Sequence, residues 1–136
     1  MSDLAELLER VKAATGPDRE LDAALLCATS PSYHLSKNSL GGTVICRDGF
    51  RWNIEDIAPY LITSIDAALA LADRVLPGWW LHGLGKSPLH GLWWCTLYSL
   101  NAKEAAEVED ADTAPLAIIA ATIYALIAQE PQPCAT

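Results

Sequence analysis

The segment from Pro115 to Gln129 constrains the fold more than any other part of this sequence. It reads as a helix that is apolar on nearly every side, rather than along one stripe. The apolar stretch from 114 to 128 has 15 residues, which is short of the roughly 20 that a membrane span needs. Such a helix is buried either inside the protein or at an interface. The remaining elements are therefore expected to pack around it, or a second chain to cover it.

Three further helices are predicted from apolar positions at helical spacing. The first covers residues 2–14. The second starts at Pro17, where a proline sacrifices no hydrogen bond, and it carries acidic residues in its first turns. The third covers 67–75, after a start signal at 63–66 and before the stop Pro77-Gly78.

Two β-hairpins are also predicted. Strands 43–47 and 50–54 flank Asp48-Gly49, a dipeptide typical of a two-residue hairpin turn. Strands 79–84 and 89–99 flank a turn at 85–88, and a simple four-residue turn there places Trp79 opposite Trp94. We interpret 31–42 as a loop and 101–112 as irregular, acidic chain.

These elements follow the order α-α-β-β-α-β-β-α. The order predicts an α+β fold with one mostly antiparallel sheet and helices packed on it. The 136 residues match one ordinary domain, so we expect a single domain over 1–136, with 131–136 as a flexible tail.

The charge of the chain excludes several classes of partner. Acidic residues outnumber basic ones 17 to 9, which gives a formal charge of -8. Such a chain repels phosphate backbones and anionic lipid surfaces, so we expect no direct nucleic-acid or membrane partner. The N-terminal residues do not read as a signal peptide, which predicts a cytoplasmic protein. The four cysteines are far apart and lack metal-binding spacing, so we expect reduced thiols, no metal and no cofactor.

Three stretches resemble one known family, in the same order and at the same spacing. They are residues 13–23 (AATGPDRELDA), 60–71 (YLITSIDAALAL) followed by Pro77-Gly78-Trp79, and 111–121 (ADTAPLAIIAA). They look like the phage ABA sandwich domain family of small phage and prophage proteins. This chain departs from the family pattern at Ala114-Pro115, where the family usually has Thr-Pro, and in its paired tryptophans. The resemblance implies a helix–sheet–helix sandwich and a phage gene, but no biochemical activity.

No arrangement of residues in the sequence indicates catalysis. The three histidines have no visible nucleophile or carboxylate partner, so we predict that the protein is not an enzyme. Gly85-Lys86-Ser87 resembles the end of a phosphate-binding loop, but position 80 is Trp where that motif requires Gly.

The tryptophans are the most informative candidates for binding. The tryptophans occur as two neighbouring pairs, Trp79-Trp80 and Trp93-Trp94, and neighbours on a strand point to opposite faces of the sheet. One face can bury one member of each pair, so the other member must be covered by a helix, a partner subunit or a ligand. Core packing would explain them, and so would a stacking surface for nucleobases or a protein interface. With basic residues for phosphates, the candidate ligand-binding residues are Trp79, Trp94, Tyr98, His90, Lys86, Arg47 and Arg51.

The resulting hypothesis is a phage-encoded accessory protein that counters host defence in an infected bacterium. Its sharpest form is a non-catalytic sponge, an oligomer that sequesters a nucleotide immune signal. The alternatives are an acidic inhibitor that mimics nucleic acid and blocks a host nuclease or defence complex, and a minor virion or assembly component. The final helix and the spare tryptophans predict self-association.

Overall fold

The computed structural model describes residues 3–30, 32–99 and 104–129. Over these residues the chain is α+β and contains two three-stranded antiparallel sheets. We call β1-β2-β3 sheet A and β4-β5-β6 sheet B. The elements are α1 (Asp3–Ala13), α2 (Arg19–Thr29), β1 (His34–Lys37), β2 (Thr43–Arg47), β3 (Phe50–Asn53), α3 (Ile54–Ile57), α4 (Ile65–Val75), β4 (Trp79–Lys86), β5 (Trp93–Ser99), β6 (Glu104–Ala111) and α5 (Ala114–Gln129).

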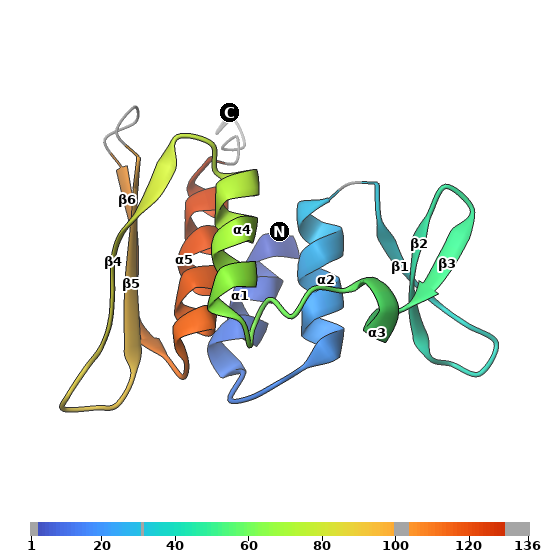
Figure 1. Ribbon diagram of the computed structural model, residues 1–136, viewed down its shortest axis with the longest axis horizontal. Helices are drawn as coiled ribbons and strands as arrows, with labels where there is room; N and C mark the ends of the chain where they lie inside the picture. The colour runs from blue at the N-terminus through green and yellow to red at the C-terminus, as the bar shows by residue number, and fades with distance from the viewer. Residues whose placement is uncertain (1–2, 31, 100–103, 130–136) are drawn as a thin grey trace, which may run out of the picture.

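The helices lie between the two sheets (Figure 1). Helices α4 and α5 cover one face of sheet B, α1 packs beside α5, and α2 leads across to sheet A. The predicted α+β class and antiparallel pairing are confirmed, and the predicted order of elements holds once β1, α3 and β6, which it lacked, are added. The two predicted hairpins do not share one sheet, and each sheet has a third strand that the sequence did not predict.

Helix α5 is the centre of the main hydrophobic core. Its residues from Ala114 to Ile123 are all buried, and it contacts α1, α4 and all three strands of sheet B. Thr122 is a polar residue in this apolar core, and its buried hydroxyl is satisfied because it donates to the Ile118 carbonyl oxygen at 2.8 Å. The predicted burial of this helix is therefore satisfied within the chain, and its apolar surface no longer argues for self-association.

Sheet B corrects the predicted pairing of the tryptophan hairpin. Trp79 lies opposite Ser99 and Trp80 opposite Tyr98, so the prediction that Trp79 faces Trp94 is wrong. The reason is the turn: β4 continues to Lys86, and residues 87–92 form the loop. That loop is closed by hydrogen bonds from the Ser87 N–H to the Leu92 carbonyl (2.8 Å) and from the Gly91 N–H to the Ser87 carbonyl (2.9 Å).

The acidic segment that we expected to be irregular contains the edge strand β6. Ala106, Val108 and Ala111 point into the core, while the glutamates between them are exposed. Charged side chains are a common protection of sheet edges against unwanted pairing.

Sheet A confirms the first predicted hairpin. Asp48 and Gly49 have φ values of 51° and 83°, as a two-residue turn with two left-handed residues requires, and Arg47 pairs with Phe50. Strand β1 lies within 31–42, which we expected to be a loop. A small separate core of Ala23, Ile45, Ile54 and Ala58 joins this sheet to α2 and α3.

An Arg19–Asp22 pair anchors α2 to the segment 54–62. Asp18 caps the helix by accepting from the Leu21 N–H. The Arg19 guanidinium binds the Asp22 carboxylate at 2.7 Å, donates to the Ala58 and Pro59 carbonyls, and stacks on the Tyr60 ring at 3.8 Å. Asp18, Arg19 and Asp22 thus have structural roles.

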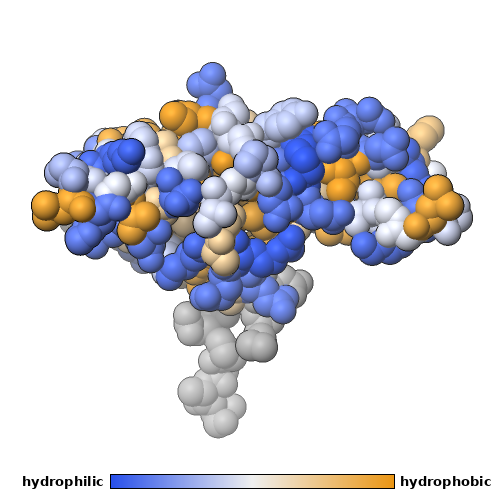
Figure 2. All heavy atoms as spheres, turned by 90° about the horizontal axis from the view of Figure 1, so that it is seen from below, coloured by the Kyte–Doolittle hydropathy of each residue, from blue (hydrophilic) through white to orange (hydrophobic). Residues whose placement is uncertain are grey.

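Hydrophilic side chains dominate the middle of the surface, and hydrophobic ones show at both ends (Figure 2). Exposed Leu89 lies in the loop of sheet B, while in sheet A exposed Leu40 lies in a turn and exposed Phe50 begins β3. Among the described residues, none of the helices has the length and apolar character required to cross a bilayer.

Candidate functional site

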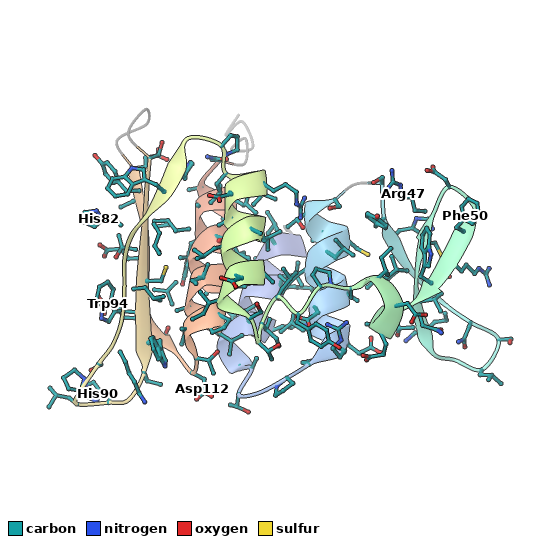
Figure 3. All side chains as sticks on the ribbon, viewed as in Figure 1. Arg47, Phe50, His82, His90, Trp94 and Asp112 are labelled. Carbon is teal, nitrogen blue, oxygen red and sulfur yellow. The ribbon has the colours of Figure 1, made fainter. Side chains whose placement is uncertain are left out.

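Sheet B has one face against the helices and one face that no described element covers. Figure 3 shows His82 and Trp94 on the uncovered side. Along β5 the side chains alternate: Cys95 and Leu97 are buried, whereas Trp94 and Tyr98 face the opposite way. We call this second side the outer face. Its larger and polar side chains are Trp80, His82, Trp94, Thr96, Tyr98, Glu107 and Glu109.

An aromatic cluster occupies one half of the outer face. The Trp80 ring lies edge-on to the rings of Tyr98 and His82, with distances between ring centroids of 5.9 and 5.3 Å. The ring centroids of His82 and Tyr98 are 6.3 Å apart. Trp80 and His82 lie two residues apart on β4, so alternation along the strand places both on the outer face, and a β-bulge follows between Leu81 and Gly83. Trp80 is nevertheless 43% exposed, so the cluster leaves a large aromatic surface in contact with solvent.

Trp94 lies flat on the neighbouring strand in the other half of the outer face. A Cβ atom added to Gly83 or Gly85 would fall 2.7 Å from atoms of the Trp94 indole. The two glycines, one residue apart on β4, therefore form a flat seat for the ring. The arrangement matches the general pairing of an aromatic side chain with a glycine on the adjacent strand. Trp94 remains 39% exposed, with one side of its ring supported by backbone.

A pocket of about 300 Å³ adjoins Trp94, and we call it the Trp94 pocket. It lies between the 87–92 loop and strands β5 and β6. Its lining residues are Ser87, His90, Trp94, Thr96, Glu107, Val108 and Glu109. No lysine or arginine is among these described residues, so the two glutamates give the pocket a negative charge.

Lys12 is the basic side chain in an adjoining pocket that shares Glu107 and Glu109. Its ammonium group donates to the Tyr124 hydroxyl at 3.4 Å and lies 5.9 Å from the ring centroid. The hydrogen bond with Tyr124 and the charge of Asp110 raise the pKa of Lys12. Lys12 is thus engaged by Tyr124, outside the Trp94 pocket.

The structure brings together some of the residues predicted to bind a ligand. Trp94 and Tyr98 share the outer face, and His90 lines the Trp94 pocket. Lys86 ends β4 opposite Trp93, close in sequence to this loop but not lining the pocket. Trp79 lies on the other face and is 8% exposed in the main core, so the predicted sharing of a face by Trp79 and Trp94 is wrong.

The two candidate arginines lie elsewhere. Arg47 and Arg51 belong to sheet A, at the opposite end of the molecule from Trp94 (Figure 3). The Arg47 guanidinium donates to the Tyr33 hydroxyl oxygen at 3.0 Å, and its central carbon lies 5.2 Å from the centroid of the Tyr33 ring. Neither arginine can share a ligand of nucleotide size with the Trp94 pocket.

Sequence reasoning missed several outer-face residues, namely Trp80, His82, Gly83, Gly85, Glu107 and Glu109. Two alternating patterns could have found them. Gly83 and Gly85 alternate around Leu84 in β4, and Glu107 and Glu109 alternate around Val108 in β6. Alternation of this kind places side chains on one face of a strand.

A larger cavity of about 700 Å³ lies between α1, α2 and β1. Its floor is mainly apolar, and its charged members Glu6, Glu9 and Arg10 are exposed residues of α1. Cys27 is its only thiol among the lining residues, and burial raises the pKa of that thiol, which disfavours a reactive thiolate. Because its charged side chains are exposed and its thiol is a poor nucleophile, we place the candidate site at sheet B instead.

Within the described part of the chain, no three histidine, cysteine or acidic side chains gather as metal ligands would. Cys27, Cys46 and Cys95 are free thiols, and Cys134 lies outside the described residues. In comparisons with known proteins, no family model, no curated protein and no solved structure matches this chain.

Proposed function

We propose that this protein acts by binding, and that the outer face of sheet B binds a basic protein partner. The observation that carries the proposal is an exposed aromatic cluster beside two glutamates, on a sheet face that no described element covers. Tryptophan and tyrosine are the side chains most often central to protein interfaces.

Charge favours a basic partner over other occupants. Glu107 and Glu109 border the aromatic residues, and the chain as a whole carries a formal charge of -8. Complementary charge speeds association and rejects wrong partners. A second copy of this chain would bring the same glutamates to the contact, so we favour a different protein.

The biological setting of this proposal comes from the family resemblance alone. In that setting the protein is a phage-encoded accessory protein that counters host defence. Its partner is then the basic surface of a host nuclease or defence complex. This corresponds to the acidic inhibitor that the sequence suggested as an alternative.

The nucleotide sponge is a second candidate, and the exposed ring of Trp94 favours it. Stacking of a base on an indole contributes roughly 1–3 kcal/mol. Glu107 and Glu109 oppose it, because they would repel the phosphates. With Arg47 and Arg51 on sheet A, phosphate binding is left to Lys86 and His90.

Site-specific photocrosslinking tests the proposed surface. Benzoylphenylalanine replaces Trp80 on the outer face in one variant and Phe50 on sheet A in the control. Both positions carry exposed aromatic rings, with exposures of 43% and 65%. The variants are irradiated in a bacterial extract, and the adducts are identified by mass spectrometry.

We expect position 80, and not position 50, to give one discrete adduct with a basic protein. The yield should fall as salt increases, because salt screens the complementary charges. An adduct with a second copy of the chain, an adduct of nucleotide mass, equal adducts at both positions or no adduct at position 80 each contradict the proposal.

A further inference from the structure

The Trp94 pocket has the features of a receptor for one flat cationic group. Its aromatic wall is fixed in advance, since the indole rests on the backbone at Gly83 and Gly85. A wall that is already ordered loses little conformational freedom when a ligand binds. The exposed part of the ring is therefore available for stacking at low entropic cost.

Two carboxylates of β6 lie beside this wall. Trp93 pairs with Ala111 and Cys95 with Val108, so two residues of β6, Glu109 and Asp110, lie opposite the single residue Trp94. Glu107 pairs with Thr96 on the outer face, and Glu109 lies two residues further along β6, beyond buried Val108. Alternation along the strand therefore places both glutamates in the same pocket.

The 87–92 loop closes one end of the pocket. The His90 N–H lies 3.4 Å from the Ser87 hydroxyl oxygen, and the two backbone hydrogen bonds of the loop hold Ser87 in place. His90 and Ser87 thereby add polar groups opposite the glutamates. The volume of about 300 Å³ is at the lower end of the range for ligand pockets, which suits a single side chain.

We propose that the Trp94 pocket binds the guanidinium group of an arginine side chain presented by the partner. This inference rests on the proposed function, because it names the group by which the partner is recognised. A guanidinium is planar and cationic, so it stacks on an indole face and also donates paired hydrogen bonds to carboxylates. An ammonium group matches the charge but not the flat wall.

The test is an NMR titration that observes the indole N–H signals of the tryptophans. The probe is the peptide acetyl-Gly-Gly-Arg-Gly-Gly-amide, and its control carries citrulline, a neutral analogue of arginine, at the central position. The W94F variant assigns the Trp94 signal. We expect saturable shifts of that signal with arginine, and at least tenfold weaker binding with citrulline.

Matched variants isolate the two carboxylates. E107Q/E109Q should weaken binding of the arginine peptide at least tenfold. E6Q/E9Q, which removes the same charge from exposed positions of α1, should change it less than twofold. Unchanged spectra away from the substituted residues confirm that each variant is folded.

Equal binding of the arginine and citrulline peptides, or equal weakening by both double variants, overturns the inference. So does a mononucleotide that shifts the Trp94 signal at lower concentration than the arginine peptide. If the peptide fails while position 80 still crosslinks to a basic protein, only the arginine receptor is refuted. If crosslinking fails as well, the proposed function falls with it.

Discussion

Asp22 is a carboxylate whose side chain is 1% exposed, and its surroundings explain why it is tolerated. It accepts from the Ile62 N–H at 3.0 Å and from Arg19 at 2.7 Å. D22A leaves both donors without this acceptor, so we expect a loss of about 2–4 kcal/mol in unfolding free energy. D22N keeps an acceptor for Ile62 and should lose less. Urea unfolding at pH 7 measures both, and a D22N loss as large as that of D22A contradicts this explanation.

Asp22 also makes the unfolding free energy depend on pH, in a direction that its raised pKa determines. Burial raises the pKa of Asp22 above its ordinary value of 3.8, against the opposing effects of the Ile62 and Arg19 hydrogen bonds. The folded state then holds a proton more tightly than the unfolded state does. The contribution of Asp22 to stability therefore falls as pH rises through the window between the ordinary and the raised pKa.

We expect the unfolding free energy of the wild type, minus that of D22N, to decrease as pH rises from about 4 to 7. Urea titrations at intervals across this range measure the difference. A difference that instead grows with pH would show that the pairing with Arg19 outweighs burial and lowers the pKa of Asp22.

The cysteines should differ in reactivity according to burial. Burial raises the pKa of the Cys95 thiol to about 12, and Cys95 has no exposed surface. Cys27 is half-buried, with a pKa that is also raised by burial. In a C134S background at pH 8, we expect a thiol reagent to label Cys27 first and Cys95 only after unfolding. Peptide mapping of the labelled protein shows which cysteine reacts first. Labelling of Cys95 before Cys27 would contradict this prediction.

At the scale of elements, strand β4 owes its shape to two glycines. G83A and G85A each place a methyl group 2.7 Å from the Trp94 indole, so the ring must leave its seat or the strand must shift. We expect each to lower the unfolding free energy by about 1–3 kcal/mol. G16A is the control: apart from its neighbours in the chain, no residue has an atom within 4 Å of its Cβ position, and we expect a change within about 0.5 kcal/mol.

A double-mutant cycle separates this contact from other effects of the glycines. In a W94A background the added methyl group meets no ring, so G85A should become nearly neutral in urea unfolding. If G85A lowers the unfolding free energy of the W94A protein as much as that of the wild type, the loss comes from strain in the strand itself. The contact between Gly85 and the Trp94 ring would then not explain it.

The same elements show how far the sequence determines the fold. The Asp48-Gly49 hairpin was predictable because its turn residues select one geometry. The tryptophan hairpin was not, because Pro88 and Gly91 both signal a turn and only tertiary pairing decides where β4 ends. The apolar face of β6 consists of small residues separated by acids, so its alternation is weak. Strand β1 has no buried residue and left no pattern to detect.

The candidate site was predictable to a similar extent. The density of tryptophans pointed to the strand pair that carries the outer face, and Trp94, Tyr98 and His90 lie on or beside that face. Arg47 and Arg51 were included for their charge alone, and pairing in separate sheets keeps them away. Glu107 and Glu109 flank Val108 in a segment that we expected to be irregular, so their shared face was missed.

For the whole molecule, the two hydrophobic cores differ greatly in size. The main core surrounds α5, whereas the core under sheet A has four buried residues, Ala23, Ile45, Ile54 and Ala58. Regions with few buried apolar contacts open at lower free energy than the rest of a protein. Sheet A should therefore unfold locally while sheet B and α5 stay intact.

The variants I45A and I119A test this independence, since each removes a side chain with no exposed surface from one of the two cores. An isoleucine-to-alanine change of this kind costs about 2–5 kcal/mol. By hydrogen exchange, I45A should speed exchange in β1, β2 and β3 and leave α5 protected, because the small core supports sheet A alone. I119A should speed exchange in both regions, because α5 is central to the larger core on which α1 and, through it, α2 are packed. Equal loss of protection in α5 with I45A would mean that the molecule unfolds as one cooperative unit.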